Sequence, residues 1–203
     1  MRKIITTTFA TLDGVMQAPG ESNEDTSEGF AYGGWQLQSG YWDKAADKIM
    51  DSFMTTPFEL LLGRRTYEIF AGYWPNHPEI ELIATPFNSA KKYVVSPEPM
   101  ELSWNNSALI TGDVVAEIKK LKTLDGPDLW VWGSGNLIQT LLRQNLIDRM
   151  HIWTHPLTIG TGKKLFAEVT QAQHFKLIKS EISTTGVILA TYEPSEPVKP
   201  SIA

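Results

Sequence analysis

The stretch Leu-Leu-Gly-Arg-Arg-Thr-Tyr-Glu, residues 61–68, decides the fold that we infer for this chain. The apolar run Phe58–Leu62 predicts a buried strand, and the glycine after it predicts a turn into a helix that reaches about Phe70. Free N–H groups and the positive dipole end of a helix start suit a phosphate. Arg64 and Arg65 are unfavourable there unless an anion lies between them. The stretch therefore predicts a phosphate site, with two solvated surface cations as the alternative.

A second strand-to-helix turn follows later in the chain. The run Leu129–Trp132 predicts a strand, and Gly133-Ser134-Gly135 leads from it into a helix that reaches about Gln144. Only half of the dinucleotide glycine motif is present, because Ile138 stands in the place of its third glycine. An ordinary tight turn is therefore the alternative. Two such turns in one small domain could hold the two ends of a dinucleotide.

A third segment, the predicted strand Lys91–Ser96, ends in a hydroxyl residue. A hydroxyl together with arginines is the chemistry expected around a phosphorylated ribose. Serine at a strand end is also common for plain turn reasons, so Ser96 alone decides little.

The rest of the chain alternates between strand and helix patterns. Ile4–Thr11 predicts a buried first strand, Asp13–Gly40 a long glycine-rich loop, and Tyr41–Met54 a helix. The remaining expected elements are a helix over Asp113–Lys122, strands over Ala108–Ile110 and Met150–Thr154, and a hairpin of His174–Ser183 and Val187–Tyr192.

This order of elements predicts an α/β fold in three layers, α/β/α. The sheet is expected to be mixed and mostly parallel, with the hairpin as its antiparallel C-terminal end. We expect a single domain over residues 1–192. The last segment, 193–203, carries three prolines and is predicted to be a flexible tail.

The amino-acid composition excludes several classes of partner and site. The 203 residues carry 18 Lys and Arg against 23 Asp and Glu, so we expect no nucleic-acid partner. No apolar run approaches the roughly 20 residues that span a bilayer. The absence of cysteine excludes disulfides and thiolate zinc sites. His151 and His155 are four apart on a predicted strand, hence about 13 Å apart, and we predict no metal site. A soluble cytoplasmic protein is expected.

The glycine-arginine turn, the strand ending at Ser96 and the turn 133–137 occur in the order of the cofactor-binding segments of dihydrofolate reductases, which this chain resembles. Thr-Leu-Asp-Gly-Val-Met at 11–16 and His-Pro-Leu-x-x-Gly-x-Gly-x-x-Leu-Phe at 155–166 are similar to a sister group. That group is the reductase domain of riboflavin biosynthesis, the RibD C-terminal domain, with its stand-alone relatives. The resemblance covers about residues 3–192.

The resemblance implies a dihydrofolate-reductase-like fold and an NADPH-dependent reductase of a small cyclic, carbonyl or imine substrate. The implied activity is similar to that of the 5-amino-6-(5-phosphoribosylamino)uracil reductase of riboflavin biosynthesis. The cofactor pyrophosphate would lie near Gly63, Arg64, Thr66, Gly133, Gly135, Asn136, Leu137 and Ile138, and the 2′-phosphate near Arg65 and Ser96. The cleft for nicotinamide and substrate would be edged by Asp13, Gly14, Met16, Trp35, Leu157 and Gly160. The candidate catalytic residues are Asp13, Asp43 and Asp47.

Dihydrofolate reductases anchor and help to protonate their substrate with a carboxylate on the first long helix. Here Asp43, Asp47 and Asp51 are four apart on the predicted helix and so share one stripe. Counting back from Gly63 favours Asp47, whereas counting back from Pro57 reaches an alanine. A solvated acidic stripe is the alternative, and Asp43 could serve only the helix dipole.

The charge of the long loop bears on the substrate. There is no Lys or Arg from Ile4 to Asp43, and the loop carries Glu21, Glu24, Asp25 and Glu28. A substrate with a ribose phosphate needs cations, so this segment argues against an anionic substrate unless a distant or partner-chain cation reaches in. The loop aromatics suit a flat neutral or cationic ring, or else cap the core; they are Phe30, Tyr32, Trp35, Tyr41 and Trp42.

Two further functions remain as alternatives to this reductase. One is a non-catalytic ligand-binding protein on the same fold, and the other is a true dihydrofolate reductase. The aromatic side chains of the loop also suggest self-association, for which a homodimer is the commonest form.

Overall fold

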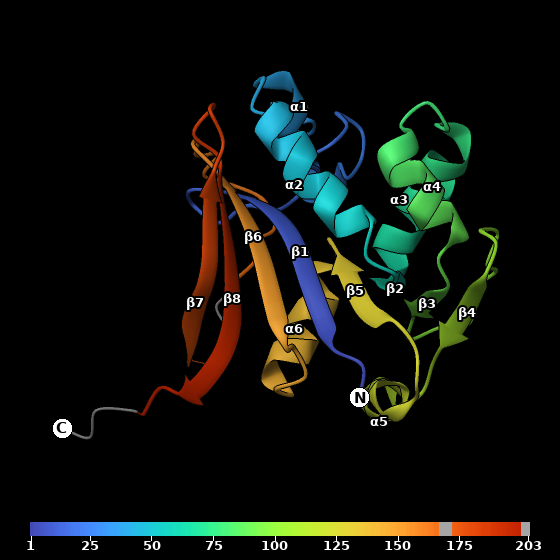
Figure 1. The fold of residues 1–203 in the computed structure, drawn as a ribbon. Helices are drawn as coiled ribbons and strands as arrows, with labels where there is room; N and C mark the ends of the chain where they lie inside the picture. Colours follow the sequence, from blue (N-terminus) through green and yellow to red (C-terminus); the bar gives the residue numbers. More distant parts are fainter. Residues whose placement is uncertain (167–171, 200–203) are drawn as a thin grey trace.

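The sheet lies at the centre of the molecule, between layers of helices (Figure 1). This computed structural model describes residues 1–166 and 172–199. Within that range eight strands follow one another across the sheet in the order β4-β3-β2-β5-β1-β6-β8-β7. Their bounds are β1 Ile4–Thr11, β2 Phe58–Gly63, β3 Lys92–Val95, β4 Ser107–Ile110, β5 Asp128–Trp132, β6 Arg149–His155, β7 Gln173–Ile182 and β8 Ile188–Pro197.

Helices cover both faces of this sheet. Met50, Tyr67 and Phe87 are buried in the core on one face, whereas Ile118 and Leu141 are buried in the core on the other. The helices are α1 Trp35–Gln38, α2 Lys44–Met54, α3 Arg64–Tyr73, α4 Glu81–Ser89, α5 Val114–Thr123 and α6 Gly135–Arg143, with 3-10 turns η1 Ser27–Gly29 and η2 Trp74–Asn76. α2, α3 and α4 belong to the first face, α5 and α6 to the second. The predicted three-layer fold is confirmed.

The pairing of the strands is mixed, as the sequence predicts. In sheet order, the six strands β4, β3, β2, β5, β1 and β6 run parallel to one another. β8 is antiparallel to both β6 and β7. Parallel strands covered on both faces are almost wholly apolar or β-branched. The buried run Ile4–Thr11 has this character, which is why its bounds follow directly from the sequence.

Two of the central strands separate toward their carboxyl ends. β1 pairs with β5 only as far as Thr7 and Trp132, but it continues to pair with β6 as far as Thr11 and His155. Beyond Thr7 the β5 side of β1 therefore has no neighbouring strand. In a parallel sheet such a parting of strands is the usual place for a ligand.

The helix predicted over Tyr41–Met54 begins later, at Lys44. Asp43 ends the preceding extended segment and accepts a hydrogen bond from the N–H of Ala46 at 2.8 Å. An aspartate in this role caps a helix start, so the residues before it stay outside the helix. The predicted loop Asp13–Gly40 also contains two short helical turns, η1 and α1.

No element is predicted between about Phe70 and Lys91, where the structure has α4. Pro86 lies inside this helix, and a proline in a helix interior normally breaks the pattern. Ala84 and Phe87 are both 1% exposed. Tertiary burial therefore stabilises a helix that the local sequence disfavours.

The predicted tail boundary at Glu193 is wrong, because β8 runs on to Pro197. Pro194 and Pro197 pair with Phe175 and Gln173 of β7. Glu193 also forms an ion pair with Arg149 at 2.7 Å. Proline is tolerated in a strand where no ladder N–H is required, so the proline content of this segment does not end the strand. Across the described residues, no helix combines the length and apolar character needed to cross a bilayer.

Buried histidine makes the fold sensitive to acid. His151 on β6 is 7% exposed, and its Nδ1 lies 2.9 Å from Thr191 Oγ1. Its ring lies 4.6 Å from that of Phe53, centroid to centroid. Burial, with smaller effects of Arg149 and Lys179, lowers the pKa of His151 to about 4. In the unfolded chain the pKa returns to about 6.5, so between these values only the unfolded state gains the proton.

We therefore expect the free energy of unfolding to fall as the pH drops from 6.5 to 4. The part due to His151 is at most about 3 kcal/mol. Urea titrations at a series of pH values, on the wild type and on His151→Gln, measure it. The variant should lose less stability across this window, and parallel curves for the two proteins would show that His151 takes up its proton in the folded state.

Candidate active site

The two predicted phosphate turns lie side by side. β2 and β5 are parallel neighbours, so both end at the same edge of the sheet. The N–H of Gly63 donates to Ser134 Oγ at 3.0 Å, and the N–H of Ser134 donates to Thr66 Oγ1 at 3.0 Å. The two turns are therefore joined by direct hydrogen bonds, although 71 and 68 residues separate the bonded groups.

The turn after β5 requires a left-handed backbone. Gly133 has a φ of +55°, and Ser134, which precedes α6, has a φ of 55°. Only glycine adopts this conformation without strain. Ser134 is held in it by three hydrogen bonds, since its hydroxyl also donates to the carbonyl of Trp132 at 3.1 Å. Neither α3 nor α6 has a side chain that caps its N-terminus. The first N–H groups of both helices thus lie near each other at the edge of the sheet, where an anion suits them.

Cations surround this place. Arg64 Nε lies 2.9 Å from Glu68 Oε1, one helical turn further along α3. Arg65 reaches only to within 3.8 Å of Asp25 Oδ1 and is 59% exposed at its side chain. Lys163 Nζ lies 2.7 Å from the other oxygen of Asp25. Burial alone would raise the pKa of Asp25, but hydrogen bonds, chiefly from Lys163, lower it.

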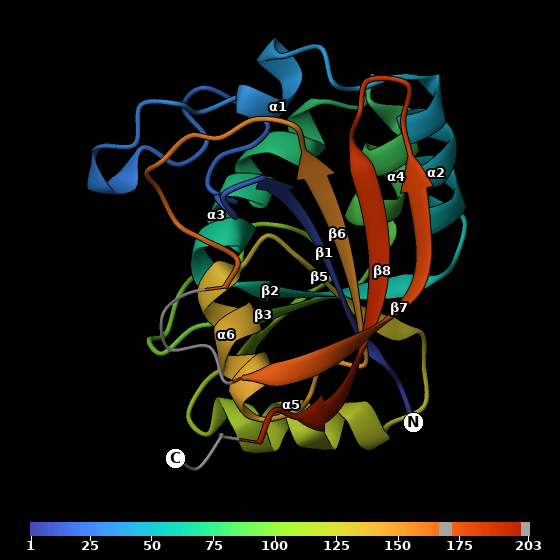
Figure 2. The same ribbon diagram turned by 90° about the vertical axis from the view of Figure 1, so that its left-hand side faces the viewer.

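A long strap crosses the same edge of the sheet. Figure 2 shows the segment after β6 passing beside the loop that follows β1. The N–H of Met16 donates to the carbonyl of Lys163 at 2.8 Å, and Val15 forms a β-bridge with Lys164. This strap brings Lys163 and Lys164, far along the chain, to the first loop. It supplies the distant cations that the loop itself lacks.

One cavity of about 1590 Å³ joins these parts. Its lining comes from β1, the loop after β1, α2, α3, α4 and both phosphate turns. Pockets for a single drug-sized ligand hold about 300–1,000 Å³, so this cavity has room for a large ligand together with a small one. Of the residues expected to bind cofactor, it is lined by Gly63, Arg64, Arg65, Thr66, Gly133, Gly135, Asn136 and Leu137.

Several buried polar atoms of the lining have no hydrogen-bond partner within the described residues. They are Oγ1 of Thr7 and Thr8 and Nε1 of Trp74 and Trp132. Thr7, Thr8 and Trp132 are 1%, 2% and 5% exposed. A buried donor without a partner costs about 1–3 kcal/mol. Polar groups of this kind around a cavity are what a bound polar ligand would satisfy.

The three candidate catalytic carboxylates lie in different surroundings. Only Asp47 lines the cavity, and its Oδ1 accepts a hydrogen bond from Trp42 Nε1 at 2.6 Å. Asp43 caps α2 and also accepts from the backbone and hydroxyl of Thr184, and the Thr184 hydroxyl lowers its pKa most. Of the alternatives that the sequence leaves open, the structure brings Asp47 alone to the cavity.

Asp13 lies outside the cavity lining and ties two loops together. Its carboxylate accepts from the Thr11 hydroxyl at 2.5 Å and from the N–H of Gly160 at 2.7 Å and of Ile159 at 3.2 Å. The Thr11 hydrogen bond in particular lowers the pKa of Asp13 to about 2. Asp13 therefore holds the turn after β1 against the turn at Gly160.

Most of the residues expected at the substrate cleft form the support behind it. Met16 lines the cavity, whereas Gly14, Trp35, Leu157 and Gly160 do not. Trp35 is buried, and its Nε1 donates to the carbonyl of Gln17 at 2.8 Å.

Ser96 and Ile138 also lie outside the lining. Ser96 Oγ donates to the carbonyl of Glu98 at 2.6 Å and so closes its own turn. Ile138 lies on α6 and is fully buried in the core between that helix and the sheet. The neighbours Val95 and Pro97 line the cavity in place of Ser96.

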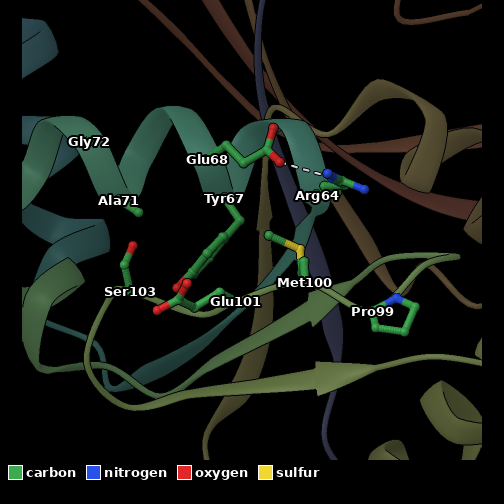
Figure 3. A pocket seen from close by; sticks show the side chains of 9 residues that line it. All are labelled: Arg64, Tyr67, Glu68, Ala71, Gly72, Pro99, Met100, Glu101 and Ser103. Atoms are coloured by element: carbon green, nitrogen blue, oxygen red, sulfur yellow. Dashed lines mark hydrogen bonds and ion pairs between the residues drawn. The ribbon is translucent and has the colours of Figure 1, made fainter.

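A smaller pocket of about 440 Å³ lies on another side of α3. Figure 3 shows Arg64 and Glu68 at its edge, joined by their ion pair, with Met100 and Glu101 opposite. Arg64 lines both this pocket and the large cavity. Its side chain is half-exposed and is paired only with Glu68 among the described residues. In the described part of the chain, no group of three or more His, Asp or Glu side chains could hold a metal ion.

The model of the RibD C-terminal domain matches residues 2–189. The chain belongs to the RibD C-terminal domain family. Two proteins of Bacillus subtilis (strain 168) are similar to it: "Uncharacterized protein YyaP", 30% identical over 149 residues (72% of this chain and 79% of YyaP), and "Uncharacterized protein YwjB", 25% identical over 131 residues (64% and 71%).

Solved structures show the same fold at low sequence identity. A "Putative riboflavin biosynthesis protein" from Shewanella sp. PV-4 has a TM-score of 0.66 at 22% identity, covering 96% of this chain and 99% of its own. A pyrimidine reductase-like protein from Corynebacterium diphtheriae has a TM-score of 0.61 at 10% identity (96% and 92%). Dihydrofolate reductase from Enterococcus faecalis, complexed with NADP(H) and RAB-propyl, has 0.60 at 13% identity (96% and 97%). The dihydrofolate-reductase-like fold of this RibD C-terminal domain is thereby confirmed.

Proposed function

We propose that this RibD C-terminal domain is an NADPH-dependent reductase that transfers hydride to a C=N or C=O group of a small cyclic substrate. One observation carries the proposal. Two uncapped helix starts are joined by hydrogen bonds at the edge of a cavity of about 1590 Å³. The N–H groups of helix starts, with cations beside them, suit the two phosphates of a dinucleotide diphosphate.

The residues present fit this cofactor. Gly63, Thr66 and the turn 133–136 would lie against the pyrophosphate, and the N–H groups of Gly135 and Asn136, the first of α6, would donate to it. Arg64 would face the pyrophosphate and Arg65 the 2′-phosphate, each through charge-assisted hydrogen bonds. Bound NADPH would supply the hydride. The unpartnered donors Thr7, Thr8 and Trp132 would orient the rings that lie at the parting of β1 and β5.

The walls of the cavity near the parting of β1 and β5 would exclude water from the reacting groups. Phe9, Trp42, Phe70 and Phe87 contribute aromatic surface to the lining. Asp47 is the carboxylate that faces into the cavity beside these rings. It would accept hydrogen bonds from the donor groups of a substrate ring and so position its C=N or C=O bond.

Saturating NADPH should raise the midpoint of thermal unfolding. A ligand that binds only the native state at about 100 times its Kd stabilises a protein by about 2.7 kcal/mol, or roughly 5–10 °C for a chain of this size. Differential scanning fluorimetry with NADPH, NADH and no cofactor measures the shift. NADPH should give the larger shift, and an unchanged midpoint at millimolar NADPH would contradict the proposal.

A further inference from the structure

The charges that line the cavity are separated along α3. Arg64 and Arg65 lie at its N-terminal end, and Lys163 joins them through Asp25. Tyr73, the last residue of the helix, lies nine residues after Arg64, which is about 13 Å along the axis. The cavity thus has a basic end, where we propose that the cofactor phosphates bind, and a second end around Tyr73.

The end around Tyr73 is acidic. Tyr73 Oη lies 3.5 Å from Glu21 Oε1, and burial together with Glu21, Glu79 and Glu24 raises the pKa of Tyr73. Glu81 lines the same side of the cavity, at the start of α4. The cations that line the cavity, among the described residues, are Arg64, Arg65, Lys163 and Lys164. Charge therefore favours a cation and disfavours an anion at the Tyr73 end.

Aromatic and unpartnered polar groups accompany these acids. The Tyr73 and Trp74 rings are 5.0 Å apart in an edge-on arrangement, and both line the cavity. The indole Nε1 atoms of Trp74 and Trp132 are buried without a partner in the described structure, and Trp132 is 5% exposed. Aromatic faces bind cations, and buried N–H groups need an acceptor. The two indole N–H groups therefore indicate a ligand that also carries a hydrogen-bond acceptor.

We propose that the substrate is a planar ring that carries a positive charge and enters the cavity at the Tyr73 end. This inference rests on the proposed reductase function, because it assigns the basic end to the cofactor. A ribose phosphate passing the Tyr73 end would meet Glu21, Glu79 and Glu81 without a balancing cation there. The substrate therefore differs in charge from the phosphorylated substrate of the riboflavin pathway.

A cationic ring also fits the titratable groups of the cavity. No histidine lines it within the described residues. When hydride adds to the carbon of a C=N⁺ bond, the π electron pair moves to nitrogen, and the product is a neutral amine. NADPH is the reductant and leaves as NADP⁺, so the atoms and electrons balance without a proton donor. A neutral imine or carbonyl would require such a donor.

Three bicyclic probes that differ mainly in charge test this proposal: N-methylquinolinium, quinoline and a quinoline carboxylate. Their affinities for the cofactor-free protein are measured at pH 7.5 by quenching of tryptophan fluorescence. The cationic probe should bind at least about five-fold more tightly than the anionic one. In the double variant Glu21→Gln/Glu79→Gln, the affinity for N-methylquinolinium should fall about three- to ten-fold. This is the change expected when two partly exposed charge pairs are lost. The control is Glu196→Gln, the same type of substitution at an exposed position of β8.

Equal affinities for the cationic and anionic probes would overturn the proposal. So would an unchanged affinity for N-methylquinolinium in the double variant, or no binding of this probe at millimolar concentration. NADPH binding is titrated separately on the same three proteins and should not weaken in the double variant. Failure to bind NADPH, with the probe affinities as expected, would overturn the reductase proposal and leave only a cation-binding site at the Tyr73 end, because the probe measurements use protein without cofactor.

Discussion

Replacing Arg65 with alanine is expected to weaken the binding of NADPH by about 10- to 100-fold and to leave NADH binding within about two-fold. The two cofactors differ only in the 2′-phosphate. A hydrogen bond to a charged group contributes about 1.5–3 kcal/mol, which gives a change of this size. The Arg65 side chain is 59% exposed, and its nearest carboxylate oxygen is 3.8 Å away. It is therefore available to a phosphate, and isothermal titration with each cofactor measures the effect.

Arg64→Ala and Arg143→Ala make this experiment specific. Arg64 is held by Glu68 beside the pyrophosphate turn, so its loss should weaken both cofactors by similar factors. Arg143 lies in the last turn of α6, outside the cavity lining, and bonds only to Thr140 within the described residues. Its loss should change neither affinity. If Arg65→Ala weakened NADPH and NADH equally, the 2′-phosphate would have to bind elsewhere.

The strands were more readily predicted than the helices because the parallel strands of this fold are buried on both faces. Ile4–Thr11 has the same bounds in the sequence interpretation and in the structure. α4 was missed because Pro86 makes its sequence look broken, and only burial of Ala84 and Phe87 shows why it forms. The end of β8 was misplaced for a related reason, since its prolines pair at positions that need no donor.

In the site, too, features set by neighbouring residues in the sequence can be predicted, whereas contacts between distant residues cannot. The two predicted phosphate turns can be located in the sequence because strand, glycine and helix follow one another within about ten residues. Ser96 looked like a phosphate ligand, yet its hydroxyl closes its own turn with Glu98. Lys163 was not considered, because nothing in the local sequence shows that it meets Asp25, 138 residues away.

The register of the acidic helix was left open by the sequence for a physical reason. The sequence pattern puts Asp43 and Asp47 on one stripe of a predicted helix, and spacing alone cannot show which of them meets a cavity. In the structure Asp43 is the N-cap and lies just before α2. The contact of Asp43 with Thr184, 141 residues later, directs its carboxylate toward the hairpin. Of the two carboxylates, Asp47 therefore lines the cavity, where it accepts a hydrogen bond from the indole N–H of Trp42.

Asp47→Asn is expected to reduce kcat/KM at least about 100-fold with a compound that the protein reduces, and to leave NADPH affinity within about two-fold. The carboxylate would accept hydrogen bonds from ring donors and stabilise positive charge on the substrate, and a misplacement of the reacting group by about 1 Å can cost about 10²-fold. NADPH absorbance with C=N, C=O, pyrimidine and dihydrofolate substrates measures turnover. Affinity for N-methylquinolinium should also fall, about five- to ten-fold, so the variant can be assessed by binding alone.

Asp51→Asn is the matched control, because Asp51 is exposed on the same helix one turn later and does not line the cavity. It removes the same charge from α2, so a general electrostatic effect of the helix would appear in both variants. We expect turnover and probe affinity of Asp51→Asn to stay within about two-fold of the wild type. Equal losses in the two variants, or full turnover in Asp47→Asn, would show that the Asp47 carboxylate does not contact the substrate. The hydrogen bond from Trp42 would then serve only to fix the start of α2.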